Sequence, residues 1–241
     1  MKRCWAEILG GCSKQASGEH YVGKGLFEGV TTHGLHSSLE GRSLPVSNLK
    51  ANILCKKHNN RLSVADQEAI HFHEGLRGLF QRQEKADLLS GDGLWTPEQY
   101  KVDALLFGRW LCKLHCNFLT LGGIDSPEYY VRYAFGEHTT PAPRFYLRVQ
   151  SDDVLGYQQR VWYANFPGGP CKQDEYGTFH VFFMGFHFLV CPYDLTRSIK
   201  VKLTESTRDR FYMGDWMDKP RQIQVEPHAL VVKSFAFDWG D

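Results

Sequence analysis

Three cysteines and one histidine in the first 58 residues constrain the fold of this chain more than any other feature. Cys55 and His58 are separated by two residues, and the earlier Cys4 and Cys12 supply a second pair. Thiolate and imidazole groups are ligands of tetrahedral zinc, and two ligands close in sequence form a rigid turn around the ion. The quartet predicts a structural zinc site with four protein ligands and no open position for water. Because the spacing of Cys4 and Cys12 is wide, the alternative is that both are small buried residues.

The composition is that of an ordinary globular protein. The chain has 241 residues, of which 42% are hydrophobic and 23% are charged, and these values are typical of soluble domains. Its seven cysteines are an odd number, and in a chain of this length they do not indicate a disulfide framework. The sequence has no apolar run of roughly 18 residues and no apolar signal segment, so we expect a cytoplasmic protein without membrane contact.

Positive charge is concentrated near the N-terminus. Residues 1–61 contain nine lysines and arginines against four acidic residues, although the formal net charge of the whole chain is only +1. A basic segment on a slightly acidic body favours a polyanionic partner such as nucleic acid. The alternative is a small zinc domain that simply has a lysine-rich surface.

We expect an α+β fold built in three parts. Residues 1–75 are rich in glycine and poor in core residues, so we predict a small zinc-bound module that needs its metal to fold. Residues 76–123 are predicted to be a helical segment. Residues 124–241 are rich in aromatic and β-branched residues, which predicts a mostly antiparallel sheet of unknown role packed on the helices.

Local signals place the individual elements within these parts. Apolar residues at a spacing of three and four predict a helix that begins near Ser63 as its N-cap. Thr96, followed by proline and glutamate, favours the start of a second helix that ends at about Leu121, before two glycines. Strands are expected at residues 144–150, 158–166, 178–190, 198–203 and 222–237. The third of these stretches is predicted to hold two strands that meet near Gly185.

An acid–base dipeptide lies between the two halves of the cysteine–histidine quartet. Glu19 and His20 follow a Ser-Gly turn, and Asn59 comes directly after the last predicted zinc ligand. Hydrolysis of a phosphodiester needs a base that activates water and a divalent cation that stabilises the leaving oxygen. The alternative is that Glu19 and His20 are a solvated turn pair and that Asn59 caps a helix.

The residue order Cys…Cys…Glu-His…Leu-Cys-x-x-His-Asn resembles the HNH endonucleases that have a zinc-stapled ββα-metal core. The further match Leu-Ser-x-x-Asp resembles an uncharacterised bacterial subgroup, over about residues 1–75 and more weakly in the segment 107–117. The resemblance implies a metal-dependent endonuclease that hydrolyses nucleic-acid phosphodiester bonds. The choice between DNA and RNA does not follow from it, although DNA is the more expected partner. It implies that His20 is the general base and that Glu19 and Asn59 bind a catalytic Mg²⁺ or Mn²⁺ ion.

Further site residues follow from the same hypothesis. The asparagine that orients the base in this family has two candidates, Asn48 and Asn52, and neither lies at the commonest spacing. The basic residues expected to bind phosphates are Lys24, Lys56, Lys57 and Arg61. The chain lacks the Ile-x-Pro that this family often has after His20, and no histidine follows closely after Asn59. A non-catalytic zinc-stabilised module with a degenerate site, which binds nucleic acid or protein, is therefore the alternative function.

The remaining polar clusters are interpreted as structural. His71 and His73 are two residues apart on a predicted helix, do not share a face and are expected at the surface. Cys112 and Cys116 lie on an apolar helix and are interpreted as core cysteines, with Trp110 in the same core. A third hypothesis assigns ligand or partner sensing to the β-rich part, with the N-terminal module as the effector.

Overall fold

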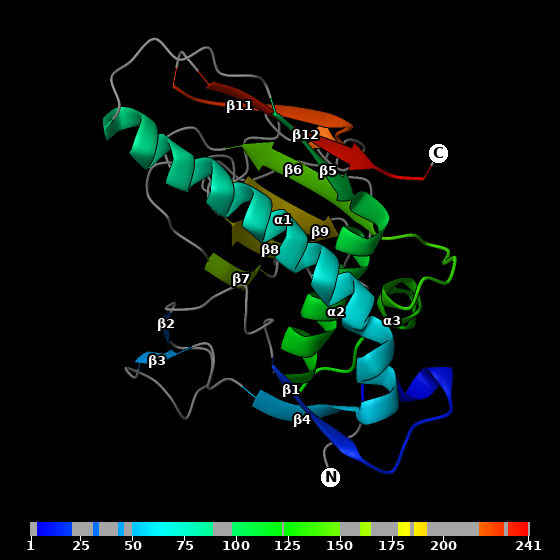
Figure 1. Cartoon of the computed structure of the whole chain (residues 1–241). Helices are drawn as coiled ribbons and strands as arrows, with labels where there is room; N and C mark the ends of the chain where they lie inside the picture. The colour runs from blue at the N-terminus through cyan, green and yellow to red at the C-terminus, as the bar shows by residue number, and fades with distance from the viewer. Residues whose placement is uncertain are drawn as a thin grey trace, which may run out of the picture.

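The computed structural model mixes helices with mostly antiparallel sheets (Figure 1), which confirms the predicted α+β class. The residues that it describes are 4–20, 31–33, 43–45, 50–88, 98–121, 123–149, 160–164, 178–183, 186–191, 217–228 and 231–240. Within them, no helix is long and apolar enough to cross a membrane. The cytoplasmic location stays a prediction.

The N-terminal part is a strand–strand–helix unit. Strand β1 (Ala16–His20) pairs antiparallel with β4 (Lys50–Cys55), and β4 leads directly into helix α1 (Lys56–Leu88). Figure 1 shows this strand pair beside the first turns of α1. A short 3-10 helix, η1 (Glu7–Leu9), precedes β1. The unit therefore brings the segments that carry all four predicted zinc ligands to one end of a long helix.

Two short strands lie between β1 and β4 in the sequence. Strand β2 (Thr31–His33) pairs antiparallel with β3 (Ser43–Pro45). They form a separate two-stranded sheet among the described residues.

Helix α1 begins seven residues before its predicted start at Ser63. Sulfur and hydroxyl acceptors bind the first amide groups of the helix: the His58 N–H donates to Cys55 Sγ at 3.5 Å, and the Lys57 N–H donates to Ser13 Oγ at 3.4 Å. The Ser63 hydroxyl instead donates to the Asn60 carbonyl at 2.8 Å, inside the helix. The predicted N-cap is wrong because the Cys55–His58 turn itself caps the helix.

The second long helix also begins at a different residue from the one predicted. Residues expected to open it form strand β5 (Glu98–Asp103), and α2 runs over Ala104–Leu121, so only the predicted end is confirmed. Asp103 is the cap, since its Oδ1 accepts the Leu106 N–H at 2.9 Å. A third helix, α3 (Glu128–Ala134), lies in the part predicted to be β-rich.

The larger sheet confirms four of the predicted strands. Its members are β6 (Arg144–Val149), β7 (Arg160–Ala164), β8 (Thr178–Phe183), β9 (Phe186–Cys191) and the short β10 (Met217–Asp218). They are ordered β10-β6-β9-β8-β7 and are antiparallel throughout. The two strands predicted to meet near Gly185 are β8 and β9.

A three-stranded sheet contains the C-terminal hairpin. The stretch predicted as one strand is two, β11 (Gln222–His228) and β12 (Val231–Asp238), which pair antiparallel. Strand β12 also pairs in parallel with β5, more than a hundred residues earlier in the chain. The predicted strand at 198–203 lies outside the described residues.

One continuous cluster of buried residues connects these elements, from Cys4 near the start to Phe237 near the end. Phe72 on α1 is fully buried at its centre. Ring centroids of Phe107, Phe186, Phe188 and Phe237 lie 4.9 to 6.0 Å from that of Phe72. Burial of each such side chain contributes about 1.5–3 kcal/mol to stability. The division of the chain into three domains stays a prediction.

The burial predicted for several single residues can be compared with their positions in this core. Trp110, Cys112 and Cys116 are buried on α2, as predicted. His71 is exposed and stacks on Tyr100, whereas His73 is buried. The expectation of a surface position is therefore wrong for His73, because the α1 face that carries it packs into the fold.

Candidate metal centre

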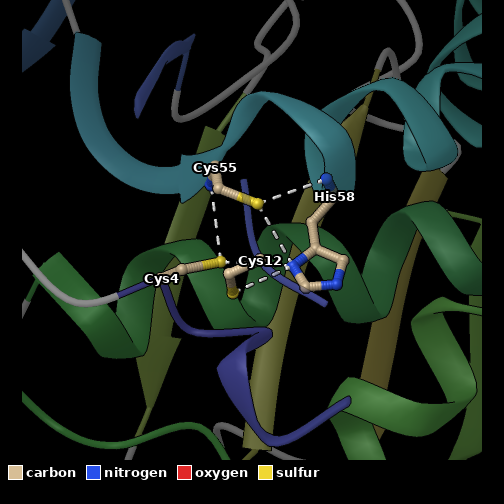
Figure 2. Close-up of side chains that lie close together, drawn as sticks. All are labelled: Cys4, Cys12, Cys55 and His58. Atoms are coloured by element: carbon tan, nitrogen blue, oxygen red, sulfur yellow. Dashed lines mark hydrogen bonds between the residues drawn. The ribbon is translucent and has the colours of Figure 1, made fainter. Parts of the chain in front are cut away.

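Four segments of the N-terminal unit place the predicted zinc ligands around one point. Cys4 precedes η1, Cys12 lies in the loop before β1, Cys55 ends β4, and His58 lies in the first turn of α1. Their ligand atoms all lie within 4.8 Å of one another, and Figure 2 shows the side chains pointing toward one another. The predicted grouping is confirmed, and the four residues lie close enough to bind a metal ion.

The distances in the group match a tetrahedral zinc site. His58 Nδ1 lies 3.5 Å from Cys4 Sγ, 3.5 Å from Cys12 Sγ and 3.4 Å from Cys55 Sγ. With Zn–S bonds of about 2.3 Å and Zn–N bonds of about 2.0–2.1 Å, a tetrahedron separates sulfur from nitrogen by roughly 3.5 Å. The donor set and its geometry therefore fit zinc, and the residues need little rearrangement to hold it.

Backbone amides surround the cysteine sulfurs. The Ser13 N–H donates to Cys55 Sγ at 3.3 Å, and the Cys55 N–H donates to Cys4 Sγ at 3.4 Å. Burial acts to raise the pKa of Cys55, but the N–H groups of His58 and Ser13 stabilise its thiolate and lower the pKa to about 7. Burial raises the pKa of Cys4, and the charge of Cys55 adds to this shift. Adjacent thiolates therefore need a cation between them.

The histidine ligand is fixed by its surroundings. His58 is 1% exposed, and burial is the main cause of its lowered pKa, so the neutral imidazole that a metal needs is favoured. The ring also hydrogen-bonds to the Gly10 backbone and meets the Phe135 ring edge-on at 5.4 Å. Phe135 in turn contacts Trp5 at 5.9 Å and carries the Arg61 guanidinium at 4.9 Å. Contacts of this kind orient metal ligands in proteins.

Glu19 lies next to this centre but is not open to solvent. It is 6% exposed, and the Lys113 ammonium of α2 lies 2.7 Å from its Oε1 atom. The same ammonium contacts both carboxylate oxygens of Asp66 on α1, at 2.8 and 2.7 Å. Burial raises the pKa of Glu19, and the positive charge of Lys113 opposes this shift. Glu19 is therefore a buried, ion-paired carboxylate.

The side chain of Asn59 contacts Glu19. This contact is a hydrogen bond, and the Asn59 Nδ2 atom donates to Ser17 Oγ at 2.8 Å. Its Oδ1 atom is buried, with no hydrogen-bond partner among the described residues. The two predicted metal ligands thus come together beside the cysteine–histidine group.

Four of the other predicted site residues are not brought to this point by any described contact. His20 ends β1 opposite Lys50, and its side chain lies outside the described part of the structure. Asn52 is exposed on β4. Asn48 and Lys24 lie outside the described residues.

Several basic side chains of the N-terminal unit are exposed to solvent. The exposed ones are Lys14, Lys50, Lys56, Lys57 and Arg61. Lys56 and Lys57 are the first two residues of α1, and the first turn of this helix contains no acidic residue. The partial positive charge of the helix N-terminus adds to theirs.

A pocket of about 420 Å³ lies on another side of the centre, between η1 and the loop that joins α2 to α3. Its lining residues are Cys4, Trp5, Glu7, Ile8, Thr120, Leu121, Gly123, Ile124, Asp125 and Ser126. The lining contains neither Glu19 nor Asn59, so this pocket does not lie at the predicted catalytic residues.

Comparison of the chain with protein-family models, with curated proteins and with solved structures finds no match. The resemblance to HNH endonucleases therefore rests on the residue pattern alone and stays a prediction. The function is inferred from the geometry of the site.

Proposed function

We propose that this protein binds nucleic acid through its N-terminal unit, which a structural zinc ion holds in shape. The observation that carries the proposal is the position of Lys56 and Lys57 inside the Cys55–His58 turn. Coordination by the two flanking ligands orders the backbone that presents both ammonium groups. Metal binding and presentation of positive charge are therefore properties of the same turn.

Arg61 extends this basic surface along α1. It lies four residues after Lys57 on the same helix, so the two side chains share a face. Its guanidinium is positioned over the Phe135 ring at 4.9 Å. Exposed lysine and arginine side chains at a helix N-terminus suit the phosphates of a nucleic-acid backbone, which supply affinity independent of sequence.

The site supports a function in nucleic-acid binding without hydrolysis better than a function in nucleic-acid cleavage. A catalytic Mg²⁺ or Mn²⁺ ion needs oxygen ligands with room for water and phosphate, and Glu19 is buried against Lys113. The competing hypothesis is a metal-dependent endonuclease with His20 as the base and Glu19 and Asn59 as metal ligands. It is supported by the hydrogen bond between Glu19 and Asn59 beside the cysteine–histidine group.

The test is a titration of the zinc-loaded full chain with labelled duplex DNA, single-stranded DNA and RNA over a range of salt. We expect binding that weakens with salt. The double variant Lys56→Ala/Lys57→Ala should lower affinity and reduce the salt slope by about 0.9 for each duplex phosphate that the variant no longer neutralises. Lys101→Ala is the matched control, because Lys101 is exposed on β5, away from the metal-ligand group.

Two results would show that the binding surface lies elsewhere. One is an equal loss of affinity in Lys101→Ala and in the double variant, and the other is unchanged binding in the double variant. Cleavage is measured in parallel on plasmid and RNA with Mg²⁺ or Mn²⁺. No cleavage is expected. Divalent-ion-dependent cleavage that His20→Ala abolishes, with zinc content unchanged, would instead establish the endonuclease hypothesis.

A further inference from the structure

The group formed by Lys113 with two carboxylates has the composition of a cation site. Lys113 is 3% exposed, and its ammonium lies within 2.8 Å of one oxygen of Glu19 and both oxygens of Asp66. These residues come from β1, α1 and α2. Three separate elements thus direct their charged groups to one buried point.

The oxygen atoms around this point are those that a hard divalent ion prefers. Two carboxylates converge on it, and the amide of Asn59, which hydrogen-bonds to Glu19, has a buried Oδ1 atom with no partner among the described residues. Carboxylate and amide oxygens are common ligands of Mg²⁺ and Mn²⁺. In this chain an ammonium supplies the positive charge at the centre of the group.

We propose that Lys113 is the resident cation of the Glu19–Asp66 site and keeps divalent ions out of it in the native protein. An ammonium balances charge and donates hydrogen bonds, but it cannot coordinate a water molecule and lower its pKa as a metal ion does. The site therefore holds β1, α1 and α2 together without activating water. This inference is independent of nucleic-acid binding.

The charges at the site explain why removal of the lysine should admit a metal. The described charged groups that face the ammonium are Glu19 and Asp66, whose two negative charges exceed its single positive charge. Without the ammonium, two buried carboxylates face each other, and this repulsion favours any cation that fits. If Lys113 had only a structural role, its replacement would lower stability without increasing the affinity of the protein for a metal ion.

The experiment compares zinc-loaded wild type with Lys113→Ala, which leaves space for an ion, and Lys113→Met, which fills the space of the lysine stem. Mn²⁺ binding is measured by electron paramagnetic resonance, and thermal unfolding is followed with and without Mn²⁺. Lys113→Ala should bind one Mn²⁺ at least about tenfold more tightly than wild type, and its Tm should rise with Mn²⁺. Lys113→Met should do neither, and Glu19→Gln added to Lys113→Ala should abolish the gain.

Three results would overturn the inference. One is Mn²⁺ binding to wild type that Glu19→Gln removes, because the lysine would then not exclude the ion. The second is a folded Lys113→Ala protein that binds Mn²⁺ no better than Lys113→Met. The third is a Lys113→Ala protein that stays unfolded in Mn²⁺ while Lys113→Met folds. Each of these outcomes is read without nucleic acid, so it leaves the proposed function untouched.

Discussion

At the scale of single residues, Cys55 combines more structural roles than the other residues of the candidate metal centre. Its sulfur lies 3.4 Å from His58 Nδ1 and accepts backbone N–H groups from both Ser13 and His58. The residue also ends β4 and directly precedes α1. Loss of its thiolate therefore removes a ligand and the acceptor for two amide groups, one in the first turn of α1 and one in the loop before β1.

We expect Cys55→Ser to lose the zinc that wild type binds at about one equivalent, because a hydroxyl is a poor replacement for a thiolate ligand. Thermal stability should fall together with metal content. Cys112→Ser is the matched control, since Cys112 is equally buried but lies on α2, outside the quartet. Metal analysis and thermal unfolding of both variants provide the measurement. Full zinc occupancy in Cys55→Ser would remove the quartet as the metal site.

The sequence predicted the grouping of Cys4, Cys12, Cys55 and His58 but not the partner of Glu19. Cys55 and His58 lie in one turn, so their spacing in the sequence is enough to predict that their side chains are close together. Lys113 is far from Glu19 in the sequence, and only the packing of α2 on the N-terminal unit brings them together. The position of Lys113 among the apolar residues of a predicted helix was the available indication, because a buried ammonium requires an anionic partner.

At the scale of elements, the Lys113 ion group ties β1 and α1 to α2. We expect Lys113→Met to destabilise the protein by about 3–5 kcal/mol, because it leaves two buried carboxylates without a cation. Glu19→Gln should cost less, since Lys113 keeps Asp66 as its partner. Chemical denaturation of the zinc-loaded variants measures both.

A surface group with the same charges, one basic side chain between two carboxylates, supplies the control. Arg132 on α3 also lies between two carboxylates, those of Glu128 and Glu137, but all three side chains are substantially solvent-exposed. Arg132→Met should therefore change stability far less than Lys113→Met, because water screens exposed ion pairs. Equal losses in the two variants would show that burial of the Lys113 group has no special role.

Elements that depend on local pattern were predictable, and those that depend on distant pairing were not. Alternating aromatic residues located β6, β8 and β9, and the glycine pair located the end of α2. Strand β5 was predicted as the start of a helix from its local Thr-Pro-Glu signal. It is a strand because β12 pairs with it in parallel, and no local signal encodes that partner.

At the scale of the whole molecule, the metal centre is joined to the rest of the fold rather than attached to it. The Trp5 indole donates to Asn117 Oδ1 on α2 at 2.9 Å, across more than a hundred residues. Phe135, at the end of α3, packs on the His58 ring. Residues that touch the metal ligands are thus the same residues that bury α2 and α3 against the N-terminal unit.

We therefore expect zinc removal to loosen α2 and α3 as well as the N-terminal unit. Hydrogen exchange followed by mass spectrometry, before and after treatment with a chelator, should show reduced protection at residues 50–60, 104–121 and 128–134. Reloading with zinc should restore it, and Cys112→Ser should behave as wild type does. A loss of protection confined to residues 4–75 would contradict this expectation and would support the three-part division predicted from the sequence. The continuous cluster from Cys4 to Phe237 favours the wider loss, because buried residues in mutual contact unfold together.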